Sequence, residues 1–171
     1  MARKTRQVET RMVTEYIVQN YGKFPSINAV PLGKIDNELM ATQGYKKAIG
    51  LSRPYRPEAD AIVVLPNYLL LIEAKVWNVI NGLAKLPLYK SLIPFTPELQ
   101  QYMPREILME LVVGTTNSNL EIMAKDMGVA IKVYSPPWLQ DVVNSMNVYW
   151  TKGYQQERSR IIEMRKTLGV D

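Results

Sequence analysis

Hydrophobic residues recur at helical spacing near the start of the chain, in the segment TRQVETRMVTEYIVQNYG. The apolar stripe consists of Val8, Met12, Val13, Tyr16 and Ile17, and a glycine that suits a helix end follows it. At 100° per residue, Glu9 projects into the middle of this stripe, whereas Glu15 falls toward its edge. Two explanations of Glu9 stay open. Either it extends past the stripe to water or precedes a helix that starts later, or it directs a carboxylate into a buried site.

The rest of the chain alternates between strand-like and helix-like segments. Val, Ile and Leu dominate residues 58–65 and 68–76, which predicts a buried β-hairpin. Loops with a short helix around 36–44 are expected in residues 23–57. Beyond the hairpin we expect a helix at 86–92 that starts near Pro87 and a short helix from Thr96. A strand in 106–116 should precede a helix at 118–128, which has a capping box of Ser118 and Glu121. A strand at 129–134 and a basic helix at about 153–168 should follow. This order predicts one α/β domain over residues 1–171, with a mixed central sheet of four to five strands flanked by helices.

Composition restricts the chemistry that the chain can perform. The 171 residues include no cysteine and no histidine, which excludes disulfides, thiol nucleophiles, histidine-based triads and Cys/His zinc sites. Any metal must be held by oxygen ligands, which favours Mg²⁺, Mn²⁺ or Ca²⁺. Any general base must be Asp, Glu, Lys or Tyr.

Charge and hydropathy narrow the possible partners and the location. The net charge of +5 is compatible with nucleic-acid binding, a property that many other basic proteins share. No apolar run reaches the length of a membrane span, and the start MARKTRQVET lacks the apolar middle of a signal peptide. We therefore expect a cytoplasmic protein with no membrane partner.

The predicted hairpin carries charges among residues that should face a core. Pro and Asn suit the centre of the turn at residues 65–68, and this placement sets Asp60 directly across from Glu73, and Glu58 across from Lys75. Glu73 and Lys75 then share one face of the sheet, and Asp60 joins them from the neighbouring strand. Two explanations remain. The carboxylates lie at the sheet end, in water or bonded to an arginine such as Arg53 or Arg56, or a divalent cation bridges them.

At these residues the chain resembles the PD-(D/E)XK nuclease superfamily. The signature of that family is an Asp near the start of one strand and Glu/Asp-x-Lys on its hairpin partner, after a helix that bears a Glu. Here Glu9, Asp60, Glu73 and Lys75 match it; E-A-K fits the second half, whereas P-E-A-D departs from the tight P-D of the first half. The segment K-L-P-L-Y, residues 85–89, is similar to a Gln/Lys-x₃-Tyr feature of branches like bacterial recombination exonucleases. Alternatively, Lys85 is an ordinary solvated lysine.

The resemblance implies a restriction-endonuclease-like core and a Mg²⁺-dependent (endo)deoxyribonuclease that hydrolyses phosphodiester bonds, with Mn²⁺ as a substitute cofactor. It implies that Asp60 and Glu73 bind the metal together with the carbonyl of Ala74. Glu9 would hold the metal through water or hold a second one. Lys75 would position the nucleophile and stabilise charge on the phosphate.

DNA is the expected partner, because a phosphodiester substrate requires basic contacts outside the site. The candidates are Arg53, Arg56, Lys85, Tyr89, Arg158, Arg160 and Arg165. Apolar residues in the tail, such as Ile161 and Ile162, would allow a homodimer. The alternative function is a non-catalytic DNA-binding or assembly subunit, for example of a phage or mobile element. A nucleotide-dependent enzyme is not indicated, since GLAK and VVGTT do not meet the spacing of a P-loop.

Overall fold

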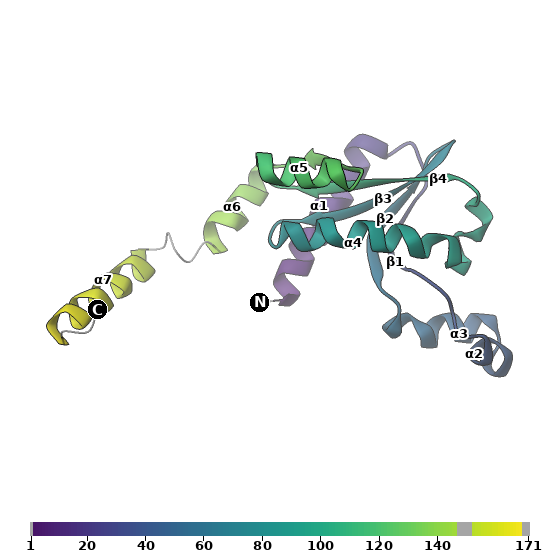
Figure 1. The fold of residues 1–171 in the computed structure, drawn as a ribbon, viewed down its shortest axis with the longest axis horizontal. Helices are drawn as coiled ribbons and strands as arrows, with labels where there is room; N and C mark the ends of the chain where they lie inside the picture. The colour runs from purple at the N-terminus through teal and green to yellow at the C-terminus, as the bar shows by residue number, and fades with distance from the viewer. Residues whose placement is uncertain (1, 147–151, 169–171) are drawn as a thin grey trace. The chain divides into compact units, whose positions relative to one another are not determined.

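The computed structural model of the chain describes residues 2–146 and 152–168. It divides into two compact units, Met1–Tyr134 and Ser135–Asp171. The first unit contains a five-stranded sheet, drawn in Figure 1 with the helices around it. Its strands are β1 (Ser26–Pro31), β2 (Glu58–Val64), β3 (Tyr68–Lys75), β4 (Glu106–Val113) and β5 (Val129–Val133). The expectation of one domain over the whole chain stays a prediction.

Helices connect these strands, and two further helices lie in the described part of the second unit. The first unit has α1 (Ala2–Tyr21), α2 (Asn37–Gln43), α3 (Tyr45–Ser52), α4 (Val79–Leu92) and α5 (Ser118–Asp126), with short 3₁₀ helices η1 (Arg53–Tyr55), η2 (Ile93–Phe95) and η3 (Pro97–Tyr102). The second has α6 (Pro137–Met146) and α7 (Lys152–Leu168). None of the helices in the described segments is long and apolar enough to cross a lipid bilayer.

The strands lie in the sheet in their chain order, from β1 to β5. The pairs β1–β2 and β2–β3 are antiparallel, and the pairs β3–β4 and β4–β5 are parallel. Each parallel pair is joined through a helix, α4 for the first and α5 for the second, as parallel connections require. The predicted fold class, a mixed sheet of four to five strands flanked by helices, is confirmed.

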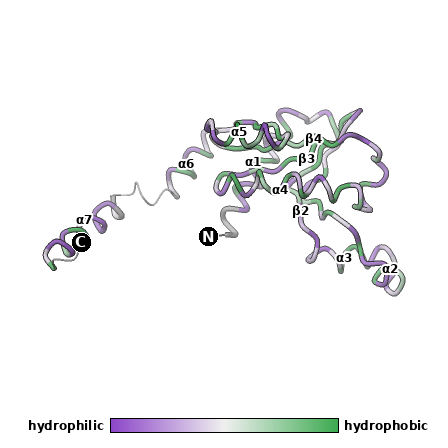
Figure 2. Tube along the Cα trace, viewed as in Figure 1, coloured by the Kyte–Doolittle hydropathy of each residue, from purple (hydrophilic) through white to green (hydrophobic). Residues whose placement is uncertain are grey.

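The core lies on both faces of this sheet. Side chains alternate between the faces, so the register pairs Ile72 with Glu110 on one face and Glu73 with Leu111 on the other. Helix α4 packs on the face of Leu111, where its Leu83 and Leu86 are fully buried. Helix α1 covers the opposite face. The central strands consist largely of hydrophobic residues (Figure 2), which explains why the hydrophobic pattern of the sequence is enough to locate them.

Several predicted boundaries hold, and two helices differ from the prediction. The hairpin, α1, the short helix at 36–44 and the tail helix form where the sequence places them. The predicted cap at Ser118 is wrong by one residue, because Asn117 caps α5 by accepting a hydrogen bond from the amide of Leu120 at 3.0 Å. The helix predicted to start near Pro87 instead begins at Val79, with Pro87 inside it.

An interior proline removes one helical hydrogen bond and costs about 3 kcal/mol. Burial of an aliphatic side chain contributes about 1.5–3 kcal/mol, so packing Leu83 and Leu86 against the sheet offsets the defect at Pro87. The hydrophobic pattern did not predict β1, α3 or α6. Strand β1 contains Pro31 and lies at the sheet edge, where a strand tolerates proline and its pattern is weak.

Candidate active site

The β2–β3 hairpin sets two carboxylates beside each other. Its turn closes with a hydrogen bond from the amide of Leu65 to the carbonyl of Tyr68 at 3.0 Å. Pairing runs from Val64 opposite Leu69 to Ala61 opposite Ile72. Asp60 and Glu73 are the next two residues in this register, which confirms the predicted pairing of the strands. The sequence therefore located the turn and the face that carries the charges.

Asp60 lies where the backbone of β2 departs from a regular ladder. On its β1 side, Asn28 pairs with Ala61 and Val30 pairs with Ala59, while Ala29 between them adopts a φ of +52°. Left-handed backbone is rare for a residue with a Cβ and stores strain of about 1–3 kcal/mol. On its β3 side, the Asp60 carboxylate accepts a hydrogen bond from the amide of Ala74 at 2.9 Å. Asp60 is thus held to β3 by its side chain, just past the last paired residue.

Lys75 lies at the centre of the charged group. Its Nζ is 3.0 Å from Glu9 Oε2, 3.2 Å from Glu73 Oε1 and 3.9 Å from Asp60 Oδ2. Burial lowers the pKa of the Lys75 ammonium, but the surrounding carboxylates of Glu73, Asp60 and Glu9 raise it more, so the pKa is raised overall. Lys75 therefore remains a cation, and it links all three acids.

Glu9 reaches this group from α1, on the far side of the sheet. Its carboxylate accepts hydrogen bonds from Lys75 Nζ at 3.0 Å and from the amide of Val76 at 3.2 Å, where β3 ends. Glu15 instead binds Arg11 at 2.8 Å and accepts a hydrogen bond from Tyr134 at 3.3 Å. Of the two explanations for Glu9, a carboxylate directed into a buried site is therefore the one that the structure supports.

Glu73 is the most unusual member of the group. Its side chain is 3% exposed, and its Oε2 is buried without a hydrogen-bond partner. Burial and then the charge of Asp60 raise the pKa of Glu73 to about 7, although Lys75 and Lys85 pull it down. A buried carboxylate oxygen without a hydrogen-bond partner lowers the stability of a folded protein. This oxygen is therefore the atom of the site that most clearly lacks a partner.

Helix α4 closes the site on the sheet face that carries Lys75. A side chain at Gly82 would place its Cβ 2.4 Å from Lys75 Cγ, so only glycine permits this approach of helix and strand. One turn further on, Lys85 Nζ lies 3.9 Å from Glu73 Oε1. Tyr89 is buried on the same helix, and burial together with the charges of Glu73 and Asp60 raises the pKa of its hydroxyl. Lys85 thus lies beside Glu73 with 39% of its side chain exposed, and the predicted contacts of Lys85 and Tyr89 with DNA stay predictions.

The donor set suits a hard divalent cation held by few protein ligands. Mg²⁺ is commonly bound by one or two carboxylates, with waters and substrate phosphates as its other ligands. Asp60 and Glu73 supply two carboxylates, and Glu73 Oε2 is available. Across the residues that the structure describes, no three acidic side chains come together in a way that would hold a metal by themselves. The resemblance placed Glu9 among the ligands. In this structure the Glu9 carboxylate accepts hydrogen bonds from Lys75 Nζ and from the amide of Val76.

The arginines near the hairpin do not contact the two carboxylates, contrary to one of the alternatives. Arg53 binds Glu58 at 3.1 Å. Arg56 is buried and binds Glu98 through two hydrogen bonds of 2.7 and 2.8 Å, and it also donates to the carbonyl of Pro31. The guanidinium of Arg56 is thus bound inside the protein, and the predicted contact of Arg56 with DNA stays a prediction.

The basic residues of the tail belong to the other unit. Arg158, Arg160 and Arg165 lie exposed on α7, as do Ile161 and Ile162. Their predicted roles in DNA binding and in a homodimer stay predictions.

The sequence did not indicate three features in or beside the site. Gly82 looks like any glycine in a helical segment, and the strained backbone of Ala29 has no sequence signal at all. Arg6 binds Glu58 from α1 at 2.5 Å, a contact across 52 residues that no local pattern reveals. Only the preference of an interior helical glycine for close packing could have indicated Gly82.

Comparisons with known proteins give distant structural likenesses. No protein-family model and no curated protein matches the sequence. The chain is similar to the crystal structure of a repair endonuclease from Pyrococcus abyssi, with a TM-score of 0.47 and 12% identity over 74% of this chain and 47% of that one. It is similar to EndoMS in complex with double-stranded DNA, with a TM-score of 0.43 and 13% identity over 76% of this chain and 46% of that one.

A third solved structure, AF1548, a protein of unknown function, has a TM-score of 0.46 and 10% identity over 76% of this chain and 60% of that one. The chain thus spans about half the length of the first two structures. The function of this chain is therefore inferred from its own residues.

Proposed function

We propose that this chain is a metal-dependent nuclease that hydrolyses phosphodiester bonds of DNA. The observation that supports the proposal best is the Oε2 atom of Glu73, buried and without a hydrogen-bond partner beside a second carboxylate and a lysine. A purely structural ion cluster would satisfy such an atom, because leaving it unpaired costs free energy. A cation that binds between Asp60 and Glu73 supplies the missing partner.

Charge balance supports the same proposal. Glu9, Asp60 and Glu73 carry three negative charges when ionised, against two positive charges on Lys75 and Lys85, which leaves one negative charge in excess. An excess of negative charge repels a phosphate group unless a cation is added. The same excess attracts a divalent cation, so the site favours binding metal and phosphate together over binding phosphate alone.

Each residue has a proposed part in the reaction. Asp60, Glu73 and the carbonyl of Ala74 hold Mg²⁺, with Mn²⁺ as a substitute. The ion supplies Lewis acidity and lowers the pKa of a water molecule. Lys75 would position the attacking water molecule and stabilise the negative charge that grows on the phosphate oxygens. Glu9 fixes the Lys75 ammonium through its 3.0 Å contact, and it would contact a bound metal through a water molecule.

A cleavage assay tests the proposal. Plasmid, linear duplex, single-stranded and branched DNA are incubated with the protein in Mg²⁺, Mn²⁺, Ca²⁺ or excess EDTA. We expect cleavage with Mg²⁺ and Mn²⁺, little turnover with Ca²⁺ and none in EDTA, and Asp60→Asn should abolish the activity. Lys125→Gln, which changes an exposed residue of α5, is the control and should cleave normally.

The possible results separate the alternatives. Robust cleavage in EDTA would reject the metal assignment. Binding of DNA without cleavage in any metal would favour the non-catalytic DNA-binding subunit. Neither binding nor cleavage of any of these substrates would reject both functions.

A further inference from the structure

A second charged group lies next to the candidate active site, built from Arg6, Arg53 and Glu58. Arg6 of α1 donates to Glu58 Oε1 at 2.5 Å, and Arg53 of η1 donates to Glu58 Oε2 at 3.1 Å. Each oxygen of the Glu58 carboxylate thus accepts a hydrogen bond from one guanidinium group. The arginine side chains are 76% and 54% exposed and that of Glu58 is 26% exposed, and ion pairs with an exposed partner contribute only about 0–1 kcal/mol to stability. The fold therefore has little need of this arrangement.

This group of Arg6, Arg53 and Glu58 lies close to the carboxylate of Asp60 in the candidate active site. Glu58 precedes Asp60 by two residues on β2, so the two side chains leave the same face of the strand with Cα atoms about 7 Å apart. The charge of Glu58 contributes, with those of Glu73 and Asp60, to the raised pKa of Tyr89. A nucleic-acid strand with one phosphate beside Asp60 would therefore bring neighbouring phosphates within reach of Arg6 and Arg53.

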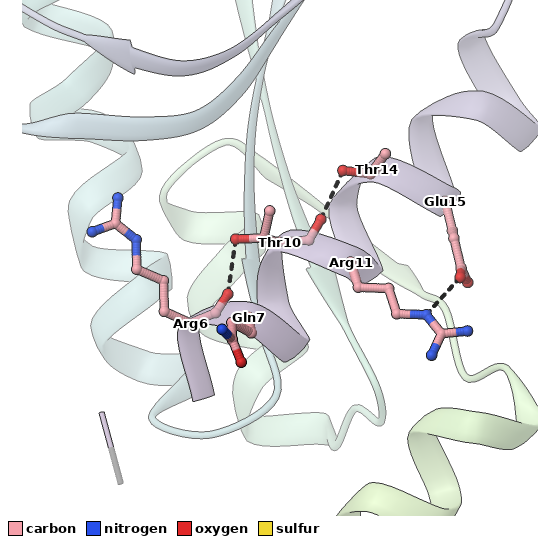
Figure 3. Close-up of a pocket in the computed structure, with 6 residues that line it drawn as sticks. All are labelled: Arg6, Gln7, Thr10, Arg11, Thr14 and Glu15. Atoms are coloured by element: carbon pink, nitrogen blue, oxygen red, sulfur yellow. Dashed lines mark hydrogen bonds and ion pairs between the residues drawn. The ribbon is translucent and has the colours of Figure 1, made fainter. Parts of the chain in front are cut away.

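The surroundings of both arginines leave their guanidinium groups able to bind an anion. Arg53 also donates to the carbonyl of Ala29 at 3.1 Å, the residue with the strained backbone opposite Asp60. Arg6 lies at one end of a shallow groove of about 700 Å³ along α1, where Thr10 and Thr14 follow it on successive turns (Figure 3). The guanidinium of Arg6 is thus open to solvent, while that of Arg53 is already oriented by the backbone.

We propose that Arg6 and Arg53 form a binding site for a backbone phosphate of DNA, and that Glu58 occupies this site until DNA displaces it. The inference rests on the proposed nuclease function and adds a substrate contact to it. A phosphate oxygen accepts hydrogen bonds from guanidinium as a carboxylate oxygen does, so Glu58 imitates the ligand. Glu58 thereby keeps the two arginines together and weakens the affinity of the free protein for DNA.

Equilibrium binding tests this site without any need for cleavage. A fluorescently labelled DNA duplex is titrated with the protein in EDTA, at several salt concentrations, and anisotropy is recorded. Arg6→Gln and Arg53→Gln should each weaken binding roughly 3- to 10-fold and reduce the slope of log affinity against log salt by about one. Glu58→Gln should tighten binding by a similar factor, because it removes the internal competitor.

Two controls make the result specific. Lys125→Gln removes a positive charge from α5, beside the far edge of the sheet, and should change both the affinity and the slope much less than the arginine variants do. The gain from Glu58→Gln should disappear when Arg6 and Arg53 are both replaced by Gln, because a competitor matters only while the site exists. A gain that survives in the triple variant would mean that Glu58 acts by general repulsion, and would overturn the proposal.

The remaining outcomes distinguish this proposal from the nuclease function. If the wild-type protein cleaves DNA but both arginine variants bind with unchanged affinity and slope, the phosphate site is wrong and the nuclease function stands. If no metal supports cleavage but the binding changes are as expected, the nuclease function fails and the phosphate site stands as a DNA-binding feature. Absence of measurable binding by the wild-type protein would overturn the phosphate site.

Discussion

The ammonium of Lys75 lies 3.0 Å from the carboxylate of Glu9, although 66 residues separate them in the chain. This contact connects helix α1 to the end of strand β3, and it determines where the lysine points. It also makes Glu9 a group that acts on the site through Lys75. Three of the expected outcomes below concern this contact and its surroundings, and a fourth concerns Glu110 on the opposite face of the sheet.

Glu9→Gln should lower the rate of DNA cleavage strongly, whereas Glu15→Gln on the same helix should be nearly silent. The first change removes the charge that fixes Lys75, whereas the second affects contacts of α1 with Arg11 and Tyr134. Single-turnover cleavage with Mg²⁺ compares the two variants. A large loss in Glu15→Gln with little effect in Glu9→Gln would show that the structure assigns the wrong carboxylate.

Lys75→Met should destabilise the metal-free protein by about 3 kcal/mol, because it leaves three carboxylates close together without their shared cation. Added Mg²⁺ should restore part of this loss by binding the folded state alone. Urea unfolding in EDTA and in Mg²⁺ measures both effects. The control Lys85→Met, at a lysine that is 39% exposed, should cost much less. Equal stability of Lys75→Met and wild type in EDTA would mean that the carboxylates do not depend on Lys75.

Gly82→Ala should reduce cleavage by roughly 10²-fold, because the added methyl group displaces the stem of Lys75, and misplacement of a catalytic group by about 1 Å can cost that much. The matched control is Gly50→Ala in helix α3, where a Cβ meets no atom within 4 Å. Gly50→Ala should keep full activity and stabilise the protein by about 0.5–1 kcal/mol. If both variants cleave at the wild-type rate, the close approach of α4 to Lys75 is not needed.

The pH dependence of stability should report on Glu110. Burial raises the pKa of this carboxyl, and hydrogen bonds from Tyr16 and Tyr21 offset the shift only in part. The folded state therefore holds the proton more tightly than the unfolded chain does. The stability that this group contributes is present at low pH and is lost as pH rises above the ordinary value of 4.5 toward the raised pKa.

Glu110→Gln should remove this part of the pH dependence, since glutamine does not ionise. Urea unfolding of wild type and variant at several pH values isolates the contribution as a difference, because Glu73 is present in both proteins. The exposed Glu121→Gln is the control and should keep the wild-type slope. A Glu110→Gln variant whose stability falls with pH as steeply as that of the wild type would show that Glu110 ionises normally.

Comparison of Glu73 with Glu110 shows how far the sequence could predict the site. Both are acidic residues inside strongly hydrophobic strands, and the pattern around them is alike. The structure separates them, because Tyr16 and Tyr21 satisfy Glu110 from α1, whereas an oxygen of Glu73 has no partner. A sequence identifies a buried acid by its neighbours along the strand. Whether that acid is satisfied depends on residues that the fold brings from elsewhere.

The same distinction applies to the rest of the prediction. Turn chemistry and two-residue alternation located Asp60 opposite Glu73, and helical phase selected Glu9, because these are short-range regularities. The burial of Arg56 was not foreseen, because the sequence around a basic loop residue looks alike whether that residue faces solvent or a carboxylate inside the protein. Its partner Glu98 lies 42 residues away and became visible only with the fold.

The order of the strands in the sheet also has a consequence for folding while the protein is being synthesised on the ribosome. Each strand is laid beside the one made just before it, so Glu9, Asp60, Glu73 and Lys75 have all been synthesised when β3 is complete. Strand β4 begins at Glu106, and at about 5–20 residues per second its first residue is added roughly 2–6 s after Lys75. Strand β4 leaves the ribosome after β3 by the same interval, and until β4 pairs with it, β3 at the centre of the final sheet is an open edge of the nascent chain.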